Sequence, residues 1–222
     1  MRLLALAAPL ISAAMNSQTH VIMGAALFGK PMPKLAWAAA AGGIVPDAPM
    51  FAIIAVLRMS GYSLNQIFRE IYWEHWWQIA NGLGHSFWIW GGLAIISGLL
   101  AHRQRNPDRH DVMLAGRASA APMVFAFSAS AVLHSFIDFL CHRDDAHMHL
   151  WPFTEWRFRS PVSYWDSNHY GDWFGLFEAL VGVVLVVVLF RRYTSWLLRG
   201  ALLVALALYV AVPAFFIFNL GG

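Results

Sequence analysis

Long apolar stretches separated by short polar connections make up most of this chain. The four strongest are Phe87–Ala101, Pro122–Cys141, Trp173–Phe190 and Trp196–Phe218. A helix needs roughly 20 apolar residues to cross a bilayer, so we expect these stretches to be membrane helices. The first is shorter than that, and we expect it either to begin earlier or to run only part of the way. The pattern predicts an all-α, integral membrane helical bundle.

Three shorter apolar stretches precede them, and none is long enough for a full crossing. His20–Gly29 and Leu35–Val45 have about half the required length, and Met50–Leu57 is shorter still. Proline interrupts a helix because it lacks a backbone N–H and clashes with the preceding turn. We therefore expect partial or interfacial helices packed on the longer ones. The prolines expected to break them are Pro31, Pro33, Pro46 and Pro49.

The first fifteen residues form a separate segment. Arg2 precedes an apolar run, Leu3–Ala14, that ends in small residues, which is the order found in a secretory signal. An uncleaved anchor, or a true start at Met15, explains the same pattern. In each case residues 16–222 are the working protein. We expect them to form one domain, because no repeat or low-complexity linker divides them.

Composition narrows the class of protein. Of the 222 residues, 59% are hydrophobic and only 12% are charged, and the mean hydropathy is +0.55. A soluble domain has more polar surface than this. The net charge of +3 is small and the arginines lie mostly in short connections, so we expect no nucleic-acid partner. The single cysteine, Cys141, excludes an intrachain disulfide. Ten histidines against twelve acidic residues favour metal chemistry.

The arginines indicate how the helices cross the membrane. The connections Arg103–Arg117 and Arg191–Arg199 are basic, and the positive-inside rule places both in the cytoplasm. The acidic segment His142–Asp172 then lies on the outer face, where its tryptophans suit a membrane interface. Three earlier tryptophans fit the same aromatic belt: Trp73, Trp76 and Trp77.

The strongest candidate for chemistry lies inside an apolar stretch. His134 and Asp138 are four residues apart, so both lie on one face of the predicted helix Pro122–Cys141. An imidazole and a carboxylate in lipid are costly unless something compensates them. A divalent metal ion compensates both, because it takes imidazole nitrogen and carboxylate oxygen as ligands. The alternative is a private ion pair between these helix neighbours.

The predicted topology carries three further candidates to the same outer face. The full set of expected metal ligands is His20, Asp47, His85, His134 and Asp138. One catalytic zinc ion takes three or four ligands, so a second ion bridged by Asp138 is also expected. A bound ion lowers the pKa of its water from about 15.7 toward 7. Asp47 and Asp138 are the candidate bases.

Each outlying candidate also has a structural alternative. His20 follows Thr19 at the start of an apolar stretch and could satisfy a helix end. Asp47 lies in a Pro-Asp-Ala-Pro turn and could be a helix N-cap. His85 could be an interfacial histidine.

Four short motifs in a fixed order carry a resemblance to a known family. They are Thr19-His20 with Gly24, then Gly43–Asp47, Gly84-His85-Ser86 and His134–Asp138. Over about Thr19–Pro152 they resemble the bacterial membrane-bound, metal-dependent hydrolases of the YdjM and YbcI type. That family commonly has His-Arg-Gly-x-Thr-His-Ser, whereas Ala80 and Asn81 stand here at the positions of its first histidine and arginine. The resemblance implies an inner-membrane hydrolase, and the arginines place its site on the periplasmic face.

The order of these ligands is also similar to the zinc-dependent phospholipase C and P1 nuclease superfamily, whose all-helical fold holds several zinc ions. This similarity implies that His20 and a bridging aspartate reach a neighbouring ion. The superfamily has a late His-x-x-x-Glu that is missing here, because Trp173 stands four residues beyond His169, so we do not expect the full cluster. The ligands implied for the first centre are Asp47, His85, His134 and Asp138. Three loop histidines could substitute as further ligands, although we favour solvated side chains for them: His142, His147 and His149.

Two functional hypotheses of different classes follow. The first is a membrane-bound hydrolase of a phosphoester in a lipid or lipid-linked substrate, with Arg157 or Arg159 as a headgroup contact. Its phosphoester substrate is implied by the superfamily alone. The second is a non-catalytic metal-binding transporter or scaffold, which uses the same ligands with a closed coordination shell. Both predict a divalent metal as the cofactor, one or two zinc ions, and membrane lipid as the partner, and neither fixes an oligomeric state.

Overall fold

The computed structural model describes residues 17–30, 32–105, 120–164 and 166–220, with side chains as far as Tyr209. The expected leader at residues 1–15 lies outside these ranges. Within them the chain forms helices and loops without a β-strand, which confirms the all-α prediction. A first helix covers residues 17–28. The later elements are α2 (Pro33–Ile44), η1 (Val45–Asp47), α3 (Ala48–Met59), α4 (Leu64–Arg69), η2 (Ile71–Trp73), α5 (His75–Gly84), α6 (Phe87–Arg105), α7 (Ala121–Cys141), η3 (Ser167–His169), α8 (Gly171–Arg192) and α9 (Trp196–Leu220).

Four stretches of the described chain are long and apolar enough to cross a membrane. They are Pro33–Met59, His75–Gln104, Ala121–Cys141 and Gly171–Arg192. In the second, α6 begins at Phe87 as expected and extends to Arg105, and α5 precedes it with a short break, so the two together reach the length of a span. In α9 the part with described side chains is a shorter apolar helix.

The expectation that prolines separate the early stretches is wrong for α2 and α3. These helices join through η1 into one apolar run of 27 residues. Pro46 and Pro49 lie within the first two positions of η1 and α3. A proline at the start of a helix is tolerated, because its missing N–H would have no partner within the helix. The join places Asp47 at the end of η1, beside α7.

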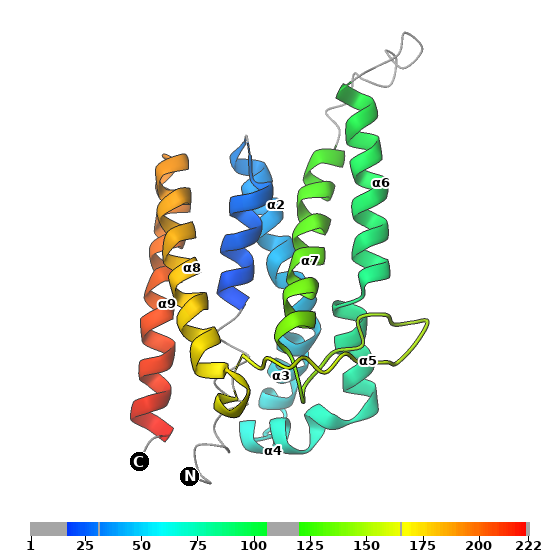
Figure 1. Ribbon diagram of the computed structural model, residues 1–222, viewed down its shortest axis with the longest axis vertical. Helices are drawn as coiled ribbons and strands as arrows, with labels where there is room; N and C mark the ends of the chain where they lie inside the picture. The colour runs from blue at the N-terminus through cyan, green and yellow to red at the C-terminus, as the bar shows by residue number, and fades with distance from the viewer. Residues whose placement is uncertain (1–16, 31, 106–119, 165, 221–222) are drawn as a thin grey trace.

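Close helix packing determines which residues meet at the centre of the bundle. In Figure 1 α7 lies between α2 and α6, and it packs closely against both of them. Gly42 allows α2 to approach α7 so closely that a Cβ there would overlap the Phe127 carbonyl oxygen. On the other side, the 17–28 helix packs on α8 and α9 through Ile22, Val186 and Leu198.

The two ends of the bundle carry different segments. The start of α2 and the ends of α6 and α8 lie together at the upper end in Figure 1, and α4 and the loop after α7 lie at the lower end. Lys34 is in the first turn of α2, and Arg191 and Arg192 are in the last turn of α8. The basic connections therefore group at one end, as the arginine pattern predicts.

We expect Gly42→Val to destabilise the protein, because the new side chain would push α2 away from α7. Overpacking of this kind costs about 1–3 kcal/mol. The matched control is Gly92→Val in α6, where a Cβ would meet nothing within 4 Å among the described residues. Thermal unfolding of the detergent-purified protein, followed by circular dichroism, should show a lower melting temperature for Gly42→Val only. Equal melting temperatures would contradict the packing role of Gly42.

Candidate metal centre

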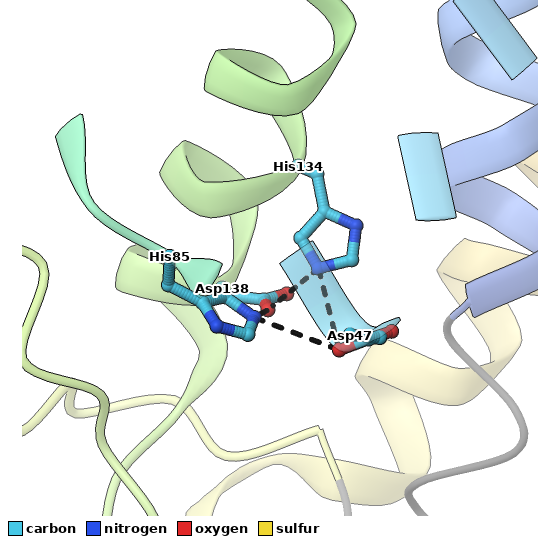
Figure 2. A group of neighbouring side chains, drawn as sticks. All are labelled: Asp47, His85, His134 and Asp138. Atoms are coloured by element: carbon cyan, nitrogen blue, oxygen red, sulfur yellow. Dashed lines mark ion pairs between the residues drawn. The ribbon is translucent and has the colours of Figure 1, made fainter. Parts of the chain in front are cut away.

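Two histidines and two aspartates from three parts of the chain meet inside the bundle, as Figure 2 shows. Asp47 ends η1, and His85 lies between α5 and α6. His134 and Asp138 lie one turn apart on α7. One ligand atom from each residue lies within 4.8 Å of the other three. Three of the side chains are at most 4% exposed and Asp47 is 13% exposed, so Asp47 is the member nearest to the surface.

Backbone carbonyl groups fix the orientation of both imidazoles. Nδ1 of His85 donates to the carbonyl oxygen of Asn81 at 2.9 Å, one turn earlier in α5. Nδ1 of His134 donates to the carbonyl oxygen of Gly43, at the end of α2, at 2.7 Å. A neutral ring with its proton on Nδ1 presents a lone pair on Nε2. In metal sites, a hydrogen bond from the ring nitrogen that does not bind the metal orients the histidine toward the ion in the same way.

The distances between ligand atoms match a small tetrahedral ion. Nε2 of His85 lies 3.0 Å from Oδ2 of Asp138 and 3.5 Å from Oδ1 of Asp47. The corresponding distances from Nε2 of His134 are 3.1 and 3.6 Å. Ligands bound at 2.0–2.1 Å around a tetrahedral ion are about 3.3 Å apart. These four distances lie near that value and all four atoms lie within 4.8 Å of one another, so the group could hold a metal ion.

Hydrogen bonds do not explain these short contacts. Within the described part of the chain, Nε2 of His85 and Nε2 of His134 have no hydrogen-bond partner. A neutral ring that donates through Nδ1 has no proton on Nε2, so in this form nitrogen lone pairs face carboxylate oxygens. Such buried, unpaired polar groups are costly. A cation bound between them would pair with both Nε2 lone pairs and both carboxylates. The residues present therefore fit a divalent metal.

The structural alternatives for these residues do not fit the geometry. Asp47 makes no side-chain cap to α3, and its Oδ2 instead accepts a hydrogen bond from Ser17 at 2.6 Å. His85 is 1% exposed and is therefore not an interfacial side chain. Asp138 contacts more than its helix neighbour His134, so the two do not form a private ion pair.

His20 reaches the second oxygen of Asp138. Its Nε2 lies 3.1 Å from Oδ1, and its ring stacks on His134 with the centroids 3.9 Å apart. His142 approaches the same oxygen at 3.7 Å. Asp138, Cys141 and His142 form a further group that could hold a metal. Asp138 thus has imidazoles near both of its oxygens, as a bridging carboxylate would.

The expectation of solvated loop histidines is wrong. His142, His147 and His149 are 7, 6 and 3% exposed, because the loop after α7 folds back over the site. The ring of His147 stacks on His85 at 4.0 Å, and His149 stacks on Phe87 at 5.0 Å. Burial lowers the pKa of His149 to about 3 and holds the pKa of His147 well below its usual value. Both rings are therefore neutral, the form that binds a metal.

Several polar residues around the site were not identified from the sequence. Asp145 lies 3.0 Å from Nδ1 of His142 and accepts a hydrogen bond from Tyr164. Thr19 donates to Glu178 at 2.5 Å and is 2.6 Å from the Tyr209 hydroxyl, which joins the His20 helix to α8 and α9. The sequence did offer a signal for Glu178, because it is a carboxylate within the apolar stretch that forms α8. No comparable pattern marks Asp145 within its charged loop.

Two other expectations are revised by the contacts. Trp77 is fully buried against Tyr72 and so does not belong to an aromatic belt, whereas Trp73 and Trp76 are about half exposed. Arg157 donates to Gln78 at 2.8 Å and to the Ala146 carbonyl oxygen at 3.3 Å. Its guanidinium therefore ties the loop to α5.

Comparison of the chain with models of protein families, with curated proteins and with solved structures returned no match. The resemblance to membrane-bound hydrolases therefore depends on the four motifs alone. The arrangement of the ligands supplies the independent argument about chemistry.

Proposed function

We propose that this protein is a membrane-bound, metal-dependent hydrolase that acts on a phosphoester in a lipid or lipid-linked substrate. The observation that carries the proposal is the convergence of two Nε2 lone pairs and two carboxylates with spacings suited to zinc. Structural zinc sites in proteins are rich in cysteine, whereas catalytic sites use histidine and carboxylate ligands. The ligand set here is of the second kind.

The residues of the centre have different tasks in this proposal. His85 and His134 hold the ion with orientations fixed by backbone carbonyls, and Asp138 contributes negative charge from the interior of the bundle. The ion supplies the charge that polarises a phosphoryl oxygen and activates water. Asp47 lies on the more exposed side, and in the catalytic form it would leave the fourth position of the ion to water and accept a proton from that water, so that His85, His134 and Asp138 hold the ion. Ser17 holds the other oxygen of that carboxylate in place.

The proposal includes a second ion on the Oδ1 side of Asp138. His20 and His142 would hold it together with the bridging carboxylate. Asp145 would orient His142 through its contact with Nδ1. The second ion would increase the charge available to a phosphoryl group, as in two-metal hydrolases.

The substrate class comes from the resemblance and from the membrane setting. Apolar helices surround the centre, so a lipid-linked substrate can approach along the bilayer. The basic end of the bundle lies away from the centre, and on the positive-inside rule this supports a site on the periplasmic face. Ala80 and Asn81 stand where the family that the chain resembles has a histidine and an arginine. The backbone carbonyl group of Asn81 still positions the ring of His85.

Hydrolysis of bis(4-nitrophenyl) phosphate and of 4-nitrophenyl phosphate by the zinc-loaded, detergent-purified protein tests this function. We expect His134→Ala to lower the rate by at least about a hundredfold. Loss of a group that only hydrogen-bonds to a metal ligand already lowers metal affinity or activity 10–100-fold, and His134 is itself an expected ligand. The matched control is His75→Ala, which changes a histidine whose side chain is 64% exposed and paired with Glu155. It should retain the rate of the wild type.

The alternative, a non-catalytic metal-binding transporter or scaffold, predicts a different result. It expects bound zinc in the wild type but phosphoester turnover equal to that of His134→Ala. That outcome would overturn the proposed hydrolase and retain the metal centre.

A further inference from the structure

A recess bordered by basic and hydroxyl side chains lies at the other end of the bundle from the metal centre, where α8 ends and α9 begins. Its volume is about 600 Å³, and its lining includes Lys30, Arg192, Thr194 and Ser195. An ammonium group, a guanidinium group and two hydroxyls therefore border one space. One guanidinium nitrogen of Arg192 donates to the Ala26 carbonyl oxygen at 2.6 Å, which holds this cation at the recess.

Among the described residues, the helices that border this recess bring no carboxylate to balance its positive charge. The segments 21–46 and 179–209, which form the neighbouring helices, contain no aspartate or glutamate. Lys34 and Arg191 add to the positive charge at the same end. Basic pockets between membrane helices attract anionic lipid headgroups. The charge of the recess therefore complements an anion.

An apolar groove continues from the recess along the helices. Tyr193 lines both spaces, and its hydroxyl donates to the Gly29 carbonyl oxygen. The groove runs between the 17–28 helix, α2, α8 and α9, and its lining includes Trp37, Ala201 and Leu202. Its volume is about 70 Å³, and Trp37 and Ala201 on its border are exposed, so it fits a hydrocarbon chain lying against the bundle rather than an enclosed ligand.

We propose that the recess and the groove together bind one anionic phospholipid, with its phosphate beside Lys30 and Arg192 and an acyl chain along Ala201. The site is separate from the metal centre. His20, which contacts the centre, is in the first turn of the 17–28 helix, whereas Ala26, which contacts Arg192, is in its last turn. The basic end belongs to the cytoplasmic side on the positive-inside rule, so the lipid is one of the inner leaflet.

Native mass spectrometry of the full chain in detergent, titrated with phosphatidylglycerol, tests this site. Lys30→Gln should weaken binding by at least about fivefold, the contribution of one basic side chain near an anionic headgroup. Ala201→Phe, a variant at an exposed position that fills the groove, should weaken binding by a similar factor. The control is Arg69→Gln, which removes the same charge from an exposed side chain of α4 at the other end of the bundle and should change binding less than twofold.

Three results would overturn the proposal. Phosphatidylcholine could bind as tightly as phosphatidylglycerol, which would remove the role of the charge. Inorganic phosphate at millimolar concentration could displace the lipid completely, which would show an anion site without a lipid. Ala201→Phe could change the oligomeric state and leave lipid binding unchanged, which would show that a second copy of the chain covers the groove.

Discussion

Asp138→Ala is expected to remove the bound metal from the purified protein. Asp138 is in contact with His85 and His134 through one oxygen, at 3.0 and 3.1 Å, and with His20 through the other, at 3.1 Å. Loss of a group that hydrogen-bonds to a metal ligand lowers metal affinity 10–100-fold. Loss of Asp138, a central ligand, should therefore lower the affinity by more than about a hundredfold. Elemental analysis by mass spectrometry should find about one zinc ion or more per wild-type chain and less than about 0.1 in the variant.

Two further variants make this result specific. Asp144→Ala changes an exposed aspartate in the adjoining loop, and this variant should bind as much metal as the wild type. Asp138→Asn keeps the size of the side chain but not its charge, so it should lose most of the metal while the fold is retained. Equal metal content in the wild type and in Asp138→Ala would contradict the metal centre, as would a wild type that binds no zinc when zinc is supplied.

Helical spacing explains why the sequence could predict part of the centre. His134 and Asp138 are four residues apart in a long apolar stretch, so their common face followed from the period of the helix alone. Their approach to His85 depends on a different element, the break between α5 and α6. The sequence predicted that these residues share one end of the bundle, but not the backbone carbonyls of Asn81 and Gly43 that orient the rings.

The loop after α7 shows where sequence patterns fail. Its histidines lie among charged residues without a helical period, and in isolation such side chains are solvated. In the structure Arg157 bonds to Gln78 and Ala146, and the loop folds against α5 and α7. Burial of His147 and His149 follows from this tertiary contact, which no local pattern encodes.

The junction of α2 and α3 was misjudged for a different reason. Proline breaks the interior of a helix but is tolerated at its start, and the sequence did not show where each helix starts. Pro46 and Pro49 lie at such starts, so the two stretches join into one candidate span. The 3-10 turn between them carries Asp47 to the metal centre, and the same prolines therefore help to form the site.

Removal of the metal by a chelator is expected to lower the melting temperature of the wild type by about 8–16 °C. The ion would link η1, the α5–α6 junction and α7, elements that separate when the chain unfolds. A ligand at a thousand times its dissociation constant stabilises the native state by about 4 kcal/mol. In a chain of this size each kcal/mol shifts the melting temperature by about 2–4 °C.

The same measurement on Asp138→Ala separates metal binding from other effects of the chelator. This variant has lost the ligand that contacts three imidazoles, so its melting temperature should be the same with and without the chelator. Asp144→Ala should respond as the wild type does, and added zinc should restore the higher melting temperature in both. If the chelator shifts Asp138→Ala as much as the wild type, the stabilising ion is bound elsewhere, because the variant no longer has the carboxylate on which the four-residue cluster depends.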